Sequence, residues 1–88
     1  MSEKELEKIL KAVANKRRLL ILRFLKKNKE ATVGQIAGAI RLSFKSTSRH
    51  LSILHGVDIV EREQRSTEVY HSISPKIFFL VKQIIDLL

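Results

Sequence analysis

Two short helix-forming segments follow each other almost without a spacer in residues 32–54, and this pairing constrains the fold more than any other feature of the chain. Thr32 followed by Gln35 is typical of a capping box, which begins the first helix. Residues 41 and 42 form the turn, and Ser43 is placed to cap the second helix. The segment therefore predicts a helix-turn-helix.

The predicted helix pair is free of acidic side chains. From Ala31 through Val57 there is no Asp or Glu, although the chain has 9 such residues, and the second helix carries Lys45, Arg49 and several hydroxyls. This segment can approach a polyanion without local repulsion. The whole chain has 17 Lys plus Arg and a formal net charge of +8, which favours a nucleic acid or an anionic surface as partner. The second helix is therefore typical of a helix that reads DNA.

Apolar periodicity predicts three further helices. In residues 3–13 the apolar residues are spaced three or four positions apart, which indicates an amphipathic helix. Asn15 can cap a second helix, whose apolar residues nearly encircle it and which therefore belongs in the centre of a small fold. Pro75 stands at the first turn of a final helix in residues 75–88, where its missing N–H costs nothing.

A β-hairpin is predicted in residues 59–73, where two β-prone runs flank a short polar turn. Asp58 precedes it, and Asp tolerates the left-handed conformation needed to leave the preceding helix. Residues 28–30 are expected to form a loop. The order is four helices, two strands and a final helix, which makes a mainly α fold with a small hairpin. We expect one winged helix-turn-helix domain over residues 1–88, with the recognition helix at about 43–55.

The composition excludes several classes of protein. There is no cysteine, which removes disulfides and thiolate metal sites and suits a reducing, cytoplasmic location. The N-terminal MSEKELEK has mixed charge, unlike a signal peptide, and the apolar last dozen residues are shorter than the roughly 20 that a membrane span needs. No Gly-rich phosphate loop, carboxylate pair or activated nucleophile is evident, so we expect neither an enzyme nor a cofactor.

Three segments resemble the ArsR-type bacterial and archaeal repressors: residues 14–25, 42–54 and 59–73. The most specific piece is Ser48-Arg49-His50-Leu51, which is similar to an S-x-H-L run of that family. The resemblance implies a homodimer that binds a pseudo-palindromic operator in double-stranded DNA and blocks transcription, with each recognition helix in a major groove. The family's metal sensors carry cysteines, or His and carboxylate ligands on the last helix. Only Asp86 is available there, so no metal is expected.

The second helix of the pair offers the side chains that would contact DNA. Lys45 and Arg49 are four residues apart and share a face, so we expect them to donate to guanine edges, with hydroxyls nearby on phosphates. His50 has two open interpretations, a contact to DNA or a neutral ring resting against the preceding helix. For Thr32 and Ser43 capping is a sufficient role. The predicted contacts, including two nonspecific ones on the wing, are Lys45, Ser46, Ser48, Arg49, His50, Arg62 and Arg65.

Other polar and aromatic residues near these segments are expected to be structural. Phe44 is in phase with the apolar side of its helix, so we expect it in the core, although a ring in the first turn could also touch a thymine methyl. His55 and His71 have no second ligand at a spacing that would bind zinc, so each is expected to be either structural or exposed. Tyr70 could anchor the hairpin to the body.

The final helix has more apolar surface than a small body can cover. A second copy of the chain, using this helix and residues 3–13, would cover the excess and pair two recognition helices about 34 Å apart. The alternative is that these residues all belong to the core of one chain. The predicted dimer interface comprises Leu6, Ile9, Leu10, Phe78, Val81, Ile85 and Leu88.

A second class of function remains open from the sequence. Winged helices also serve as protein interaction modules, and the apolar C-terminal helix could bind a foreign helix. Binding of single-stranded RNA is less favoured, because aromatic residues make up only 6% of the chain and offer few stacking platforms.

Overall fold

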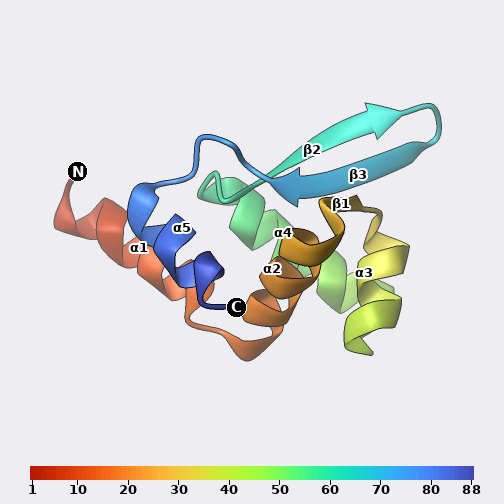
Figure 1. The fold of residues 1–88 in the computed structure, drawn as a ribbon, viewed down its shortest axis with the longest axis horizontal. Helices are drawn as coiled ribbons and strands as arrows, with labels where there is room; N and C mark the ends of the chain where they lie inside the picture. The colour runs from red at the N-terminus through yellow and green to blue at the C-terminus, as the bar shows by residue number, and fades with distance from the viewer.

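The computed structural model describes residues 1–88, which form five helices and a three-stranded sheet (Figure 1). The element order confirms the predicted winged helix-turn-helix. In chain order the elements are α1 (Glu3–Val13), α2 (Lys16–Asn28), β1 (Glu30–Ala31), α3 (Val33–Ile40), α4 (Phe44–Gly56), β2 (Val60–Arg65), β3 (Glu68–Ile73) and α5 (Phe79–Asp86).

Side-chain caps begin the helices that lead to the reading segment, and all three predicted caps are confirmed. The Asn15 side chain accepts from a backbone N–H in the first turn of α2 at 3.1 Å. Thr32 and Gln35 form the reciprocal capping box of α3, at 3.2 and 2.9 Å. Ser43 Oγ accepts from the backbone of α4 at 3.1 Å. Each cap satisfies a donor that the helix itself cannot pair.

Four tight connections use residues with positive φ, and none of them is glycine; the first is Lys29, with φ 66° between α2 and β1. Arg41 has φ 57° in the turn between α3 and α4, and Ser66 has φ 59° at the tip of the hairpin. Asp58 has φ 59° where the chain leaves α4, as its position predicted. The helix-turn-helix and the wing are therefore closed by non-glycine residues in the left-handed region.

The sheet is antiparallel with strand order β1-β3-β2. Strands β2 and β3 form the predicted hairpin, in which Val60 pairs with Ile73 and Arg65 with Glu68. Strand β1 was not predicted. It is only two residues long, and it exists because Glu30 and Ala31 pair with β3, which lies about 40 residues away along the chain. The expected loop at 28–30 is therefore partly strand.

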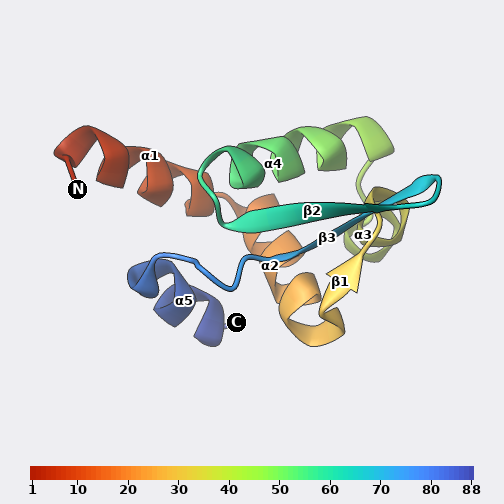
Figure 2. The same cartoon turned by 90° about the horizontal axis from the view of Figure 1, so that it is seen from above.

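The core is built around α2, which lies between α4 and α5 (Figure 2). Its residues Ile21, Leu22 and Leu25 are at most 1% exposed. Val81 and Ile85 of α5 join this core at 0% and 4% exposure, so the prediction that they line a dimer interface is wrong. Helical periodicity identified their apolar face, but this chain's own core already covers it.

The final helix is shorter than predicted. It begins at Phe79, because Pro75 and Lys76 lie in a turn. In this turn the backbone N–H of Lys76 donates a hydrogen bond to Oγ of Ser74 at 3.2 Å. The φ of proline fits this turn as well as it fits the first turn of a helix. None of the five helices combines the length and the apolar character that a membrane span requires.

Candidate nucleic-acid interface

The recognition helix α4 buries one side and exposes the other. Thr47, Leu51 and Leu54 face the core and are at most 2% exposed. Lys45 and Arg49 lie on the exposed side, and the predicted contacts Ser46 and Ser48 are half-buried beside them. In Figure 2 the helix runs along one edge of the molecule, so this side is open to a large partner.

The cations of α4 have no carboxylate partner within the chain. The ion pairs of the molecule involve Arg65 and Lys82, and neither Lys45 nor Arg49 takes part in one. An unpaired guanidinium or ammonium on an exposed helix face can donate to phosphate oxygens or to base edges without first breaking a contact. The structure thus brings together the two residues that the sequence predicted as base readers.

His50 lies half-buried against α2 rather than on the open side. Its Nδ1 accepts a hydrogen bond from Nε of Arg18 at 3.2 Å. Burial, followed by the charges of Arg18, Arg17 and Arg49, lowers the pKa of His50. The ring is therefore neutral at neutral pH, in agreement with the structural alternative weighed above. Sequence reasoning missed Arg18, because 32 residues separate it from His50 and no local pattern links them.

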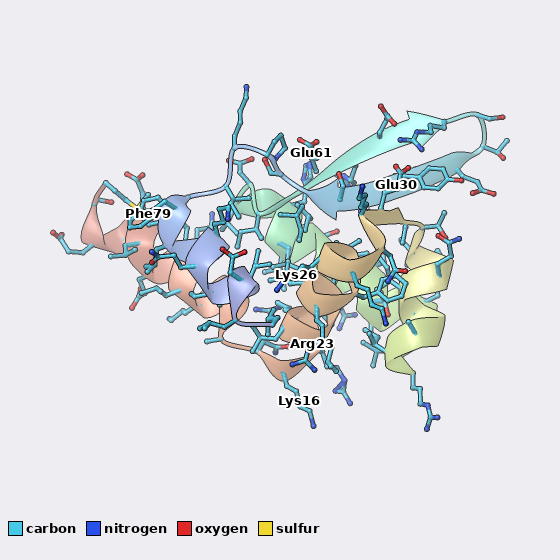
Figure 3. All side chains as sticks on the ribbon, in the orientation of Figure 1. Lys16, Arg23, Lys26, Glu30, Glu61 and Phe79 are labelled. Carbon is cyan, nitrogen blue, oxygen red and sulfur yellow. The ribbon has the colours of Figure 1, made fainter.

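The wing residue Arg65 is held by carboxylates of its own chain. Its guanidinium pairs with Glu30 of β1 at 2.6 and 3.0 Å and also with Glu63, and it lies 4.7 Å from the ring centre of Tyr70. These hydrogen bonds raise the pKa of Arg65. Figure 3 shows Glu30 at the edge of the sheet, below the hairpin. The predicted phosphate contact is thus paired inside the chain, through a Glu30 that the sequence did not single out.

Arg62, the second basic residue of the wing, belongs to a cluster with two histidines. Its Nη2 lies 3.2 Å from Nδ1 of His55 on α4, and it stands opposite His71 in the β2–β3 register. His71 is 4% exposed, its Nδ1 has no hydrogen-bond partner, and burial together with Arg62 and His55 lowers its pKa. The cluster joins the wing to α4, and His71 is structural, as expected.

Phe44 is exposed, so the prediction that it packs in the core is wrong. Its side chain is 63% exposed, because the first turn of α4 extends beyond the core and Thr47, one turn later, occupies the buried position. Phe44 helps to line a hollow of about 440 Å³ between the start of α3 and the wing. The exposed ring keeps open the alternative stated from the sequence, contact with a thymine methyl.

The family model described as bacterial regulatory protein, arsR family, matches residues 15–62, which extend from the cap of α2 into β2. The chain belongs to the ArsR family. This matches the resemblance noted in its sequence.

Individual ArsR relatives cover most of the chain. The transcriptional activator HlyU of Vibrio cholerae is 36% identical over 80 residues, which span 91% of this chain and 70% of HlyU. The transcriptional repressor PagR of Bacillus anthracis is 32% identical, over 93% of this chain and 83% of PagR. The solved structure of reduced HlyU from Vibrio cholerae has a TM-score of 0.81 at 34% identity, covering 97% of this chain and 85% of that one.

A further ArsR-like structure bears on assembly. It is the solution structure of the homodimeric winged helix-turn-helix DNA-binding domain of a possible ArsR-family regulator from Mycobacterium bovis. Its TM-score is 0.81 at 28% identity, covering 99% of this chain and 82% of that one. The similar fold extends beyond the helix-turn-helix to the flanking helices.

The flanking helices of this ArsR chain retain exposed apolar side chains. Leu10 of α1 is 39% exposed, and Leu6 and Ile9 are half-buried beside it. Phe78, immediately before α5, is 38% exposed, and Leu88 is half-buried. Two exposed apolar residues lie outside the predicted interface set: Phe79, the first residue of α5, at 67%, and Leu87, immediately after α5, at 86%. Phe79 points outward at the start of α5 (Figure 3).

No group of three or more His, Cys, Asp or Glu side chains is clustered where it could hold a metal ion. On α5 the carboxylate of Asp86 is paired with Nζ of Lys82 at 3.0 Å.

Proposed function

We propose that the chain is a homodimeric, sequence-specific transcriptional repressor that binds a pseudo-palindromic operator in double-stranded DNA. Each protomer places the start of α4 in a major groove, with Lys45 and Arg49 on base edges and Ser46 and Ser48 on phosphates. The exposed side of α4, with two unpaired cations and no acid, is the observation that carries the proposal.

The apolar side chains of α1 and around α5 support the dimer. A monomer that exposes Leu10, Phe78 and Phe79 gains by burying them against a second copy, and a two-fold axis brings identical patches together. The remaining predicted residues Leu6, Ile9 and Leu88 flank these positions. The same axis orients two copies of α4 toward half-sites one DNA turn apart, about 34 Å.

Repression is the simplest outcome of such binding, because an operator-bound dimer obstructs polymerase at an overlapping promoter. The relatives include the repressor PagR and the activator HlyU, so a promoter-fusion assay is needed to decide the direction. The proposal assigns the protein neither an enzymatic activity nor a metal, and its DNA partner implies a cytoplasmic location.

Selection of bound sites from random duplex DNA tests the proposal. We expect an enriched palindrome whose half-sites are one turn apart, and loss of its recognition in the Lys45→Ala and Arg49→Ala variants. Each good bidentate contact discriminates by about 1–3 kcal/mol, which is roughly 5- to 150-fold in affinity.

The matched control is Arg23→Ala, which removes one cation from the outer face of α2 (Figure 3). We expect it to leave the selected site unchanged. An enriched half-site without any symmetric partner would contradict the dimer, and equal binding to all duplexes would contradict sequence recognition.

A further inference from the structure

Arg18 connects three helices through one side chain. Its Nη1 donates to the backbone carbonyls of Lys11 and Ala12, each at 3.2 Å, near the end of α1. Its Nε donates to Nδ1 of His50 in the middle of α4, also at 3.2 Å. The last carbonyls of a helix lack partners within it, and the planar fork of arginine can satisfy several acceptors at fixed angles. Arg18 thus ties α4 to the end of α1.

The contact requires a neutral His50, because Nδ1 accepts only when it carries no proton. The charges of three arginines act on the ring: Arg18, which contacts it, Arg17 beside it on α2, and Arg49 on α4 itself. The end of α1 contributes backbone carbonyls to Arg18 rather than a carboxylate that could compensate a charge. A proton on His50 would therefore remove the acceptor and place a fourth cation among three.

The contact bears directly on what α4 presents to DNA. His50 follows Arg49, and Lys45 lies five residues earlier on the same helix. The core contacts of Thr47, Leu51 and Leu54 fix which side of α4 is buried. Because successive residues of a helix are offset by a fixed rotation, holding the His50 ring against α2 adds a second constraint on the direction in which Lys45 and Arg49 project. Since α1 belongs to the proposed dimer surface, Arg18 also fixes the angle between that surface and the reading helix.

We propose that Arg18 is a positioning residue for DNA recognition, which holds α4 in its reading orientation through His50, and that protonation of His50 releases this hold. The inference rests on the proposed function and adds a pH-dependent control of the same site. A direct contact between His50 and a phosphate predicts the opposite sign, since a proton on the ring would add a charge and tighten binding.

The test measures the affinity of the full chain for a duplex with its selected site and for a non-specific duplex of equal length. Ionic strength is held constant while the pH falls from about 7.5 to about 5.5, through the range in which histidine titrates. We expect the specific complex to weaken about tenfold, whereas the non-specific complex does not weaken. His50→Asn keeps an acceptor near the position of Nδ1 but cannot titrate, so its specific affinity should be independent of pH.

Two arginine variants separate positioning from charge. Arg18→Lys keeps the charge but loses the fork that reaches both α1 and His50, so we expect specific affinity at about pH 7.5 to fall about tenfold with little change in non-specific affinity. Arg17→Lys is the matched control on the neighbouring exposed arginine, and its affinities should not change. Thermal unfolding followed by circular dichroism establishes that each variant is folded at the binding temperature.

If Arg18→Lys does not fold, the comparison of the wild type with His50→Asn across pH decides the matter. Tighter specific binding in acid, an acid-induced loss that persists in His50→Asn, or equal affinities of the Arg18→Lys and Arg17→Lys variants would each overturn the inference. Failure of every duplex to be bound selectively would instead overturn the proposed function.

Discussion

The recognition helix and the wing each carry two Lys or Arg residues, yet they present them to a partner in opposite ways. On α4, Lys45 and Arg49 meet no carboxylate. On the wing, Arg65 is shared between Glu30 and Glu63, and Arg62 contacts a histidine of α4. The number of basic residues in a segment therefore does not measure its capacity to bind a polyanion. The partners that the fold supplies decide how much of that charge is available.

Removing one arginine from each region should have unequal effects on DNA binding. We expect Arg49→Ala to lower affinity for the selected site by roughly 5- to 150-fold, because it removes a base contact. Arg65→Ala should lower it less than about threefold, because that guanidinium is already neutralised within the chain. Fluorescence anisotropy with labelled duplex measures both. Equal losses from the two substitutions would show that the wing arginine is available after all.

The second test uses pH to probe the attachment of the wing to α4. The pKa of His71 is lowered in the folded chain by burial and by Arg62 and His55, so the unfolded chain takes up a proton first as the pH falls below about 6.5. The free energy of unfolding should therefore decrease in acid, by at most about 1.4 kcal/mol per pH unit for this histidine. Urea unfolding at several pH values checks the sign. Stability that rises on acidification would contradict a buried neutral His71.

The third test separates the inward side of α4 from its reading side. The hydroxyl of Thr47 is buried without a hydrogen-bond partner, so Thr47→Val should raise the free energy of unfolding by about 1 kcal/mol. Affinity for DNA should not change, in contrast to Arg49→Ala, which should alter affinity and leave stability unchanged. Denaturant unfolding and anisotropy on the same samples compare the two. A destabilised Thr47→Val chain would mean that the hydroxyl has a partner.

The smallest expected effect comes from giving the wing a free cation. Glu63→Gln removes one of the two carboxylates that hold Arg65, so affinity should rise about twofold and the salt dependence of binding should steepen by up to about one counterion. Glu61→Gln, on the same strand, is the matched control because it makes the same change in charge without an ion pair to Arg65. Identical salt slopes for both variants would refute the sequestration of Arg65.

Local signals in the sequence were sufficient for most of the fold. Asn15, Thr32 and Ser43 cap the helices that their positions predict, because a cap depends on residues three apart and little else. The hairpin was predicted from alternating apolar residues, which are also a local signal. Strand β1 was missed because a two-residue strand has no period, and it forms only through its pairing with β3.

The errors within helices have a different cause. Periodicity identifies an apolar face but does not say whether the chain's own body or a second chain covers it, so Val81 and Ile85 were assigned to the wrong partner. Nor does it say where the core ends along a helix, which is why the exposure of Phe44 was missed.

The contacts that tune the candidate site lie beyond the reach of local reasoning. Arg18 and His50 are 32 residues apart, and Glu30 and Arg65 are 35 apart. Such pairs depend on how whole elements dock, so they become visible only in three dimensions. The sequence thus identified which residues bear the charge of the site, whereas the fold determines which of those charges remain free.

The exposed Leu10 and its neighbours on α1 have a consequence for gene control. If reading an operator requires two protomers and the dimer is weak at cellular levels, the concentration of active dimer grows with the square of the protomer concentration. A doubling of expression would then raise occupancy of an unsaturated operator about fourfold. In the proposed dimer, the leucines of α1 would thereby set how steeply a promoter responds to the dosage of its regulator.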